Sequence, residues 1–250
     1  TAWLTAGVFE AHDRNDFEVV GISFGPDDNS AIRARLKAAF DQFHDVSGMD
    51  DGRIALLLRD LKIDITIDLK GHTRDSRPGI LARRPAPLQL TWLAYPATIG
   101  DCGIDAVLAD EVVLPLAAQP HYAERIVHLP GCYQSNDGAR LVPQPPSRAA
   151  VKLPESGFVF CCFNASWKIT EPVFEIWMRL LRQVDGSVLW LLDDNGGAKA
   201  NLTVAAQKLG IDPPRLIFAP HAAADAHLAR HGCADLFLDT QPYGAHTGAS

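Results

Sequence analysis

Short runs of apolar, β-branched and aromatic residues recur along the 250-residue chain, and helix-like segments separate them. In the C-terminal part these runs begin at Phe158, Ser187, Arg215 and Asp235. Strands that recur at intervals of roughly 20 to 30 residues, each followed by a helix, build a parallel sheet through right-handed crossovers. This spacing predicts an α/β fold of the doubly wound kind.

The N-terminal part shows a similar alternation with more Gly and Pro between the apolar runs. A Pro-rich polar stretch, with Pro143, Pro145, Pro146 and Pro154, follows it and is typical of a linker. We therefore expect an N-terminal lobe over 1–133, a linker over 134–154 and a C-terminal lobe over 155–250. The individual elements expected in the first lobe are strands at 18–23, 63–69, 88–92 and 106–108 and helices at 30–40 and 50–61. A helix that follows the strand at Phe158 takes Thr170 as its N-cap and Pro172 in its first turn.

Composition narrows the classes of function. The formal net charge of −7 argues against general binding to the phosphate backbone of nucleic acids. No apolar run approaches the roughly 20 residues of a membrane span, and no basic, apolar leader opens the chain. Five cysteines without a C-x-x-C pair indicate reduced thiols in a cytoplasmic protein. The start at Thr1 and the end at Ser250 suggest a piece of something longer.

Three segments carry candidate chemistry, because ligands of open parallel sheets bind beyond the carboxyl ends of the strands. In 163–168, Lys168 can place a positive charge over a phosphate; the alternative is a surface lysine. In 239–248, small residues and a Thr hydroxyl suit a pyrophosphate; the alternative is a flexible connection. In 68–74, a carboxylate, the His72 imidazole and two cations fit either an active-site edge or an ordinary polar loop.

Metal binding is not expected. His227 and His231 are spaced i, i+4 on a predicted helix, which can chelate a metal. The H-E-x-x-H pattern and a completing carboxylate cluster are missing, so the alternative of two helix-surface histidines is preferred. The pair Cys161-Cys162 lies in an apolar run, where core packing is expected.

Two signatures resemble a known family. Residues 83–89 read R-R-P-A-P-L-Q, and 92–100 read W-L-A-Y-P-A-T-I-G. Together they are similar to the R-P-A-P-x-Q…L-x-Y-P-G-T-x-G signature of O-GlcNAc transferases, a family that includes Spindly-type O-fucosyltransferases. The C-terminal part agrees, at 162–164 with Lys168, at 187–192, and from Ala234 to Thr247.

The resemblance implies two Rossmann-like lobes of the GT-B type, truncated at both ends, with a nucleotide-sugar cleft between them. It implies an inverting glycosyltransferase that moves N-acetylglucosamine from UDP-GlcNAc to Ser or Thr hydroxyls of acceptor proteins. Neither a metal nor another cofactor is expected, and a tetratricopeptide array is expected in the full-length chain.

The resemblance also implies roles for single residues. Lys168 matches the lysine that contacts the diphosphate. We expect Lys168 to be catalytic, together with His72 from the candidate segment 68–74. His227 matches the position beside the uracil, and His246 and Thr247 match a loop around the phosphates and nucleoside. The remaining residues expected to bind the nucleotide sugar are Asn164, and on the sugar side Tyr95, Pro96 and Thr98.

Several positions depart from the family pattern. Ala97 replaces a usual Gly, Gly248 replaces a usual Thr, and Trp3 stands at the last position of an H-x-x-x-[HY] segment. The active-site histidine of that segment would precede Thr1, and a ribose-binding Asp would follow Ser250. Two alternatives therefore stay open: a donor such as GDP-fucose or UDP-glucose, or a degenerate scaffold that binds a nucleotide without turnover.

Overall fold

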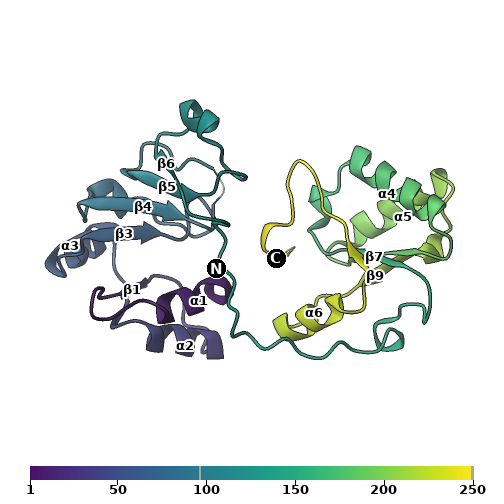
Figure 1. Ribbon diagram of the computed structural model, residues 1–250, viewed down its shortest axis with the longest axis horizontal. Coiled ribbons are helices and arrows are strands. Elements are labelled where there is room, and N and C mark those ends of the chain that lie inside the picture. Colours follow the sequence, from purple (N-terminus) through teal and green to yellow (C-terminus); the bar gives the residue numbers. More distant parts are fainter. Residues whose placement is uncertain (96, 249–250) are drawn as a thin grey trace. The chain divides into compact units, whose positions relative to one another are not determined.

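The computed structural model describes residues 1–95 and 97–248. Its residues group into two compact units, Thr1–Ala139 and Arg140–Ser250 (Figure 1). The division falls inside the segment 134–154 that the sequence predicts as a linker. Among the described residues, no helix is both long and apolar enough to cross a membrane.

The first unit contains three α-helices, six strands and two short 3-10 helices among its described residues. These are α1 (Ala2–Glu10), β1 (Val20–Ser23), α2 (Ala31–Ala39), β2 (Gln42–Asp45), α3 (Asp51–Asp60), β3 (Ile65–Asp68), η1 (Leu81–Arg83), β4 (Leu88–Trp92), β5 (Ala106–Ala109), η2 (Leu116–His121) and β6 (Arg125–His128). The predicted strands and helices are all present. Helix α1 and strands β2 and β6 were not predicted from the sequence.

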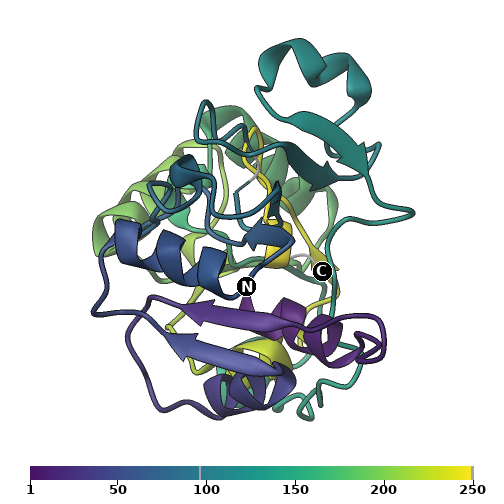
Figure 2. The same cartoon turned by 90° about the vertical axis from the view of Figure 1, so that its left-hand side faces the viewer.

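The strands of the first unit form two parallel sheets. Strands β1 and β2 pair with each other, as Figure 2 shows from the side of this unit, and the larger sheet has the order β3-β4-β5-β6. The connections within the larger sheet carry η1 and η2 instead of α-helices. Prolines explain this difference from a regular strand–helix alternation, because Pro78, Pro85, Pro115 and Pro120 interrupt helical hydrogen bonding there.

Local side chains fix where the helices of the first unit begin. The Ser30 hydroxyl accepts from the Arg33 backbone N–H at 3.2 Å, and the Asp50 carboxylate accepts from the Arg53 N–H at 2.9 Å. Both are N-cap contacts that satisfy an otherwise unpaired donor of the first turn. They explain why the predicted helix starts agree with the structure.

The second unit alternates strands and helices regularly. Its elements are η3 (Ala149–Val151), β7 (Val159–Cys162), η4 (Ser166–Lys168), α4 (Glu171–Gln183), β8 (Val188–Leu192), α5 (Gly196–Lys208), η5 (Pro213–Arg215), β9 (Leu216–Ala219), α6 (Ala224–His231), β10 (Leu236–Phe237) and η6 (His246–Gly248). Each of the four strands begins one residue after the position predicted from the sequence. The predicted α/β class is confirmed.

The strand order of the second unit is β10-β7-β8-β9, with all pairs parallel. The chain moves outward from β7 to β9 and then crosses to the other side of β7, so β7 and β10 flank a topological switch point. Helices α4 and α5 cover one face of the sheet and α6 covers the other (Figure 1). In open α/β sheets, this switch point is where ligands bind.

Strand β7 is buried on both faces, as a central parallel strand should be. Phe160 and Cys162 face the core under α4 and α5, while Val159 and Cys161 face the opposite core. Burial raises the pKa of the Cys161 thiol to about 12 and that of Cys162 to about 11. Both thiols therefore stay protonated, which confirms the expectation of core packing.

The segment from Arg140 to Pro154 belongs to the second unit and packs against the rest of it. Arg148 forms an ion pair with Asp235 at 2.8 Å, and the Cys233 thiol donates to the Pro146 carbonyl at 3.2 Å. Leu153 is buried in the core beside β7. This part of the predicted linker is therefore held by specific contacts.

The central position of β8 predicts an unequal response to the same substitution at two leucines. Leu189 is fully buried in β8, whereas Leu236 in β10 is 48% exposed. Leu189→Ala should lower the free energy of unfolding by about 2–5 kcal/mol through lost burial and a cavity. Leu236→Ala should change it by less than about 1 kcal/mol. Urea denaturation of both variants tests this, and equal losses would contradict the assigned core.

Candidate functional site

The ends of β7 and β10 are tied together by one buried amide. Asn164 follows β7, and its Nδ2 donates to Asp239 Oδ1 at 3.1 Å and to Thr240 Oγ1 at 2.7 Å. Asn164 and Thr240 are both buried, at 8% and 1% exposure. The amide therefore joins the two loops that leave the switch point.

Asp239 organises the loop that follows β10. Its Oδ1 also accepts from the backbone N–H of Thr240 at 2.8 Å and of Ala245 at 2.6 Å. The Thr240 hydroxyl in turn donates to the Tyr243 carbonyl at 2.7 Å. These bonds fold residues 239–245 back on themselves, so the segment is an ordered loop and differs from the flexible connection considered as an alternative.

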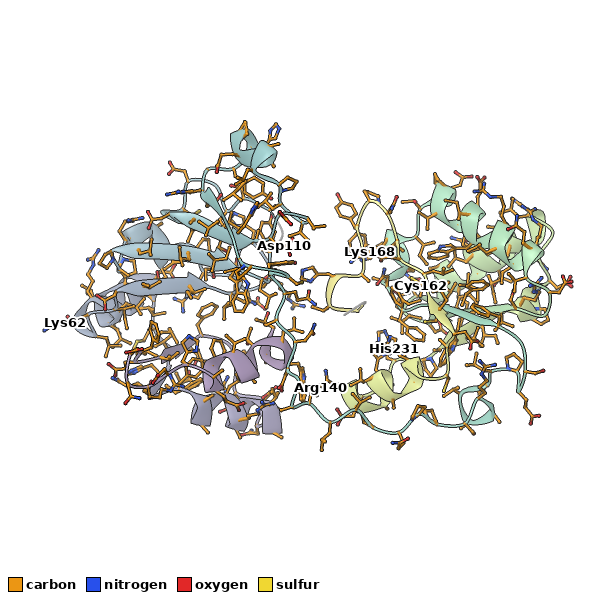
Figure 3. All side chains as sticks on the ribbon, in the orientation of Figure 1. Lys62, Asp110, Arg140, Cys162, Lys168 and His231 are labelled. Atoms are coloured by element: carbon orange, nitrogen blue, oxygen red, sulfur yellow. The ribbon has the colours of Figure 1, made fainter. Side chains whose placement is uncertain are left out.

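Lys168 reaches this loop from the other side of the switch point. Its Nζ donates to the Gly244 carbonyl at 2.8 Å, and Figure 3 shows Lys168 beside the C-terminal loop. Its short helix η4 is anchored by the Ser166 N–H, which donates to Asp194 Oδ2 at 2.8 Å. Within the described residues, no carboxylate forms an ion pair with Lys168, so its ammonium charge is not neutralised there.

Helix η6, with His246 and Thr247, lies next to the same amide. A Cβ placed on Gly248 would be 3.8 Å from Asn164 Oδ1. The structure thus brings together four of the residues predicted to bind the nucleotide sugar, all from loops at the carboxyl ends of β7 and β10. They are Asn164, Lys168, His246 and Thr247.

The start of α4 serves the same arrangement. Thr170 occupies the predicted N-cap position, with Pro172 in the first turn. Its hydroxyl makes no capping bond and donates instead to the Gln241 carbonyl at 3.2 Å. The side chain therefore stabilises the 239–245 loop, which sequence alone did not reveal.

His227 packs on the ring that precedes Asn164. The centroid of its imidazole lies 5.3 Å from that of the Phe163 ring, and the guanidinium carbon of Arg230 lies 4.4 Å from the centroid of the same Phe163 ring. Arg230 donates to His227 Nδ1, so the neutral imidazole carries its proton on Nε2. His231 also packs on Phe163, at 4.9 Å. The two histidines are thus half-buried, and their description as helix-surface residues is corrected.

Burial and the nearby Arg230 charge lower the pKa of His227 to about 4. The imidazole is therefore neutral at pH 7, and its Nε2–H is available as a hydrogen-bond donor.

Among residues 1–95 and 97–248, no group of three or more His, Cys, Asp or Glu side chains could hold a metal ion.

In the first unit, the end of β3 forms a tight turn. The Asp68 carboxylate accepts from the Lys70 N–H at 3.1 Å and from the Gly71 N–H at 2.7 Å. Gly71 has a φ of +53°, and a Cβ there would be 2.3 Å from the Tyr95 Cβ. Glycine is thus required both for the backbone conformation and for the close approach of Tyr95.

This turn presents His72. Its Nε2 lies 2.9 Å from the Ile99 carbonyl, and a carbonyl only accepts, so Nε2 carries the proton. The Tyr95 ring packs edge-on against the imidazole, with 5.4 Å between ring centroids. In the neutral ring, Nδ1 therefore holds a lone pair, the arrangement that a proton acceptor needs.

Thr98 holds the loop that contacts His72. Its hydroxyl donates to Glu124 Oε2 at 2.7 Å and accepts from the Gly100 N–H at 3.0 Å. The hydroxyl proton of Thr98 is therefore donated to Glu124. The sequence had predicted Thr98 as a residue on the sugar side of the nucleotide-sugar site. Pro96, predicted with it, lies outside the described residues.

Three residues that shape these loops were given no individual role from the sequence, although Phe163 and Asp239 lie in two of the candidate segments. Asp239 follows a strand and precedes a turn, a position where an aspartate commonly accepts backbone N–H groups, so a signal existed. Phe163 is one more apolar residue at the end of an apolar run. Glu124 is separated by 26 residues from Thr98, and no pattern in the sequence connects them.

Comparison with known proteins shows a family match that covers the whole chain. The family model described as Glycosyl transferase family 41 matches residues 1–145 and 145–250. A probable UDP-N-acetylglucosamine–peptide N-acetylglucosaminyltransferase, SEC of Arabidopsis thaliana, is 35% identical over 98% of this chain and 26% of its own length. The similarly described SPINDLY of Oryza sativa subsp. japonica is 31% identical over 94% of this chain and 26% of its own.

A solved structure agrees with these relatives. A mutant of the Thermobaculum terrenum O-GlcNAc transferase matches with a TM-score of 0.87 and 31% identity, over 97% of this chain and 46% of that one. The chain therefore spans about a quarter of the length of the curated relatives and less than half of this structure.

The close approach at Gly71 predicts a stability difference between two glycines. Gly71 and Gly131 both have positive φ, but a Cβ on Gly131 would meet nothing within 4 Å. Gly131→Ala should lower the free energy of unfolding by about 1–2 kcal/mol, the strain of a left-handed residue. Gly71→Ala should lower it by more, because Tyr95 must also move. Chemical denaturation measures both, and equal effects would show that Tyr95 is not in the way.

The low pKa of His227 predicts a pH dependence of stability. The unfolded imidazole binds a proton near pH 6.5, whereas the folded one binds it only near pH 4. Stability should therefore fall as the pH drops from about 6.5 toward 4, since the unfolded state takes up the proton first. Thermal melting of wild type and His227→Asn, with ring NMR titration, tests this.

The Asn variant should melt with a shallower dependence on pH between 6.5 and 4. Above pH 7 the two proteins should show the same pH dependence, which serves as the internal control. A wild-type His227 that titrates near 6.5 by NMR would contradict its burial against Phe163.

Proposed function

The chain belongs to glycosyl transferase family 41, and from that premise we propose that it forms catalytic machinery of a protein O-GlcNAc transferase. The enzyme would move N-acetylglucosamine from UDP-GlcNAc to Ser or Thr hydroxyls of proteins. The relatives are described as UDP-N-acetylglucosamine–peptide N-acetylglucosaminyltransferases, which supports this donor and a peptide acceptor. The chain's own contribution rests on one observation, the placement of Lys168 at the switch point of the second unit.

The position and charge of Lys168 are suitable for binding a diphosphate. It lies at the switch point, where ligands of parallel sheets bind. No ion pair among the described residues neutralises its charge. Its Nζ donates a hydrogen bond to one backbone carbonyl, that of Gly244. A carbonyl partner orients the ammonium group without cancelling its charge. An incoming phosphate oxygen can then take one of the remaining donor positions.

The transfer step follows from this placement. The acceptor oxygen attacks the anomeric carbon from the face opposite the diphosphate, and the bond from that carbon to the phosphate oxygen breaks. The configuration inverts, and negative charge develops on the leaving UDP. Lys168 would stabilise that charge more in the transition state than in the ground state, which lowers the barrier. We propose that this cation takes the place of a metal ion.

The acceptor hydroxyl must also lose its proton. We assign this to His72, whose Nδ1 holds a lone pair while Nε2–H is bound to the Ile99 carbonyl. Histidine side chains commonly act as general bases, and the tautomer fixed by the Ile99 carbonyl leaves the lone pair of Nδ1 available to accept a proton. Tyr95, packed on the ring, would limit its rotation.

The other assignments are proposed in the same sense. The neutral His227 would donate from Nε2 to a carbonyl of the base, and Asn164, His246 and Thr247 would surround the phosphates and nucleoside. Tyr95, Pro96 and Thr98 would lie toward the sugar. For the whole protein we propose a cytoplasmic location and a tetratricopeptide array that presents acceptor proteins.

Thermal stabilisation by nucleotides tests the binding site directly. In the full-length protein, UDP at about one hundred times its Kd should add roughly 2.7 kcal/mol to the free energy of unfolding. Lys168→Ala should lose most of this gain because the diphosphate loses its counter-charge. Lys199→Ala is the matched control, since Lys199 belongs to the same unit and is ion-paired with Asp193 at 2.8 Å.

Each alternative has its own result in this experiment. Stabilisation by GDP in place of UDP would favour a GDP-sugar donor. Binding of UDP-GlcNAc without transfer to an acceptor peptide would favour a nucleotide-binding scaffold. No stabilisation by either nucleotide, or an equal loss in Lys199→Ala, would contradict the assignment of Lys168.

A further inference from the structure

Glu124 is a buried carboxylate in the first unit to which no motif assigns a role. It lies between η2 and β6 and is 0% exposed. Its Oε2 accepts from the Thr98 hydroxyl at 2.7 Å and its Oε1 from the Ile99 N–H at 2.6 Å. A charge taken out of water requires such partners, and here the partners come from a loop distant in sequence.

The backbone of Glu124 is held as well. Gln119 Nε2 donates to the Glu124 carbonyl at 2.9 Å, and Gln119 Oε1 accepts from the Ile126 N–H at 2.9 Å. The carboxylate therefore projects from a fixed position at the start of β6. A side chain anchored in this way can set the position of the groups that it binds.

Ile99 connects this carboxylate to His72. Its N–H is bound by Glu124 Oε1, and its carbonyl accepts from His72 Nε2 at 2.9 Å. Ile99 is itself buried, at 3% exposure, in the core that also contains Ile54 and Ile104. The residue is thus fixed on both its polar sides, and the imidazole receives its orientation from a carbonyl that cannot rotate freely.

We propose that Glu124 is a positioning residue for His72. By holding Thr98 and Ile99, it keeps the Ile99 carbonyl aimed at Nε2 and so selects the tautomer that leaves the Nδ1 lone pair available. Its effect on catalysis rests on the proposed role of His72 as proton acceptor; its effect on the tautomer does not. Without the carboxylate, the Ile99 N–H loses its partner and the loop loses the constraint on its carbonyl.

Asp110 offers a matched control in the same unit (Figure 3). It is also a buried carboxylate, 3% exposed, and accepts from the N–H groups of Val112 and Val113 and of Tyr133, each at 2.9 Å. Those contacts organise the turn after β5. Neutralising Asp110 therefore disturbs a comparable network without touching the bond between Ile99 and His72.

The test uses Glu124→Gln, Glu124→Asp and Asp110→Asn in the full-length protein. An amide can accept on only one of its two arms, and the shorter Asp side chain cannot reach both Thr98 and Ile99. Ring ¹⁵N NMR, with His72 assigned through His72→Gln, reports the tautomer. Transfer of N-acetylglucosamine from UDP-GlcNAc to a peptide gives kcat and KM.

The wild type should show His72 protonated on Nε2. Both Glu124 variants should lose part of that population, and kcat should fall on the order of tenfold, a part of what a positioned base contributes. The donor KM should stay within about twofold, because Glu124 is not assigned to nucleotide binding. Asp110→Asn should leave the tautomer unchanged. A general loss of stability would lower kcat without changing the His72 tautomer, whereas the proposed role predicts that kcat and the tautomer change together.

An unchanged tautomer in both Glu124 variants would overturn the proposal, as would the same tautomer change in Asp110→Asn. A changed tautomer with unchanged kcat would support the positioning contact and remove His72 from the proton path. Absence of transfer in the wild type would count against the proposed function, while the NMR result would still decide the proposal.

Discussion

The amide of Asn164 joins the two strands that flank the switch point of the second unit, and the neighbouring loops depend on it. Its Nδ2 binds both Asp239 and Thr240, and Asp239 in turn folds residues 239–245. Lys168 is steered by a carbonyl of that folded loop. At this point the loops that leave the carboxyl ends of the two parallel strands diverge. The buried amide holds these two loops together by its hydrogen bonds to Asp239 and Thr240. The proposed diphosphate site is built on this one contact.

The first unit uses two carboxylates for the same purpose. Asp68 turns the chain after β3, and Glu124 fixes the loop at 98–99 whose carbonyl orients His72. In both units the groups proposed for chemistry are held by backbone carbonyls: Lys168 by Gly244 and His72 by Ile99. A carbonyl fixes a donor without neutralising it. The ammonium group keeps its charge, and the imidazole keeps the lone pair on its other nitrogen.

Much of the fold was predictable because it depends on local patterns. The strands of the second unit were located within one residue, since four apolar runs stand between clear helices, and Ser30 and Asp50 marked the starts of two helices. Helix α1 was missed because it is apolar around most of its circumference and shows no distinct polar face. Strands β2 and β6 were missed because four residues of mixed polarity give no clear period. The prolines of the first unit indicated loops, and the structure places 3-10 turns there.

The sequence by itself determined the α/β class, the parallel strands of the second unit and the segments that contain Lys168 and His72, because these follow from periodicity, turn residues and resemblance along the chain. Only the tertiary structure decided what those side chains touch. The bond from Asn164 to Thr240 joins residues 76 positions apart, and that from Thr98 to Glu124 joins residues 26 apart. Such pairs form when strands distant in sequence become neighbours in a sheet, and no local pattern records which loops then meet. For the same reason the low pKa of His227 and the tautomer of His72 appeared only with the folded structure.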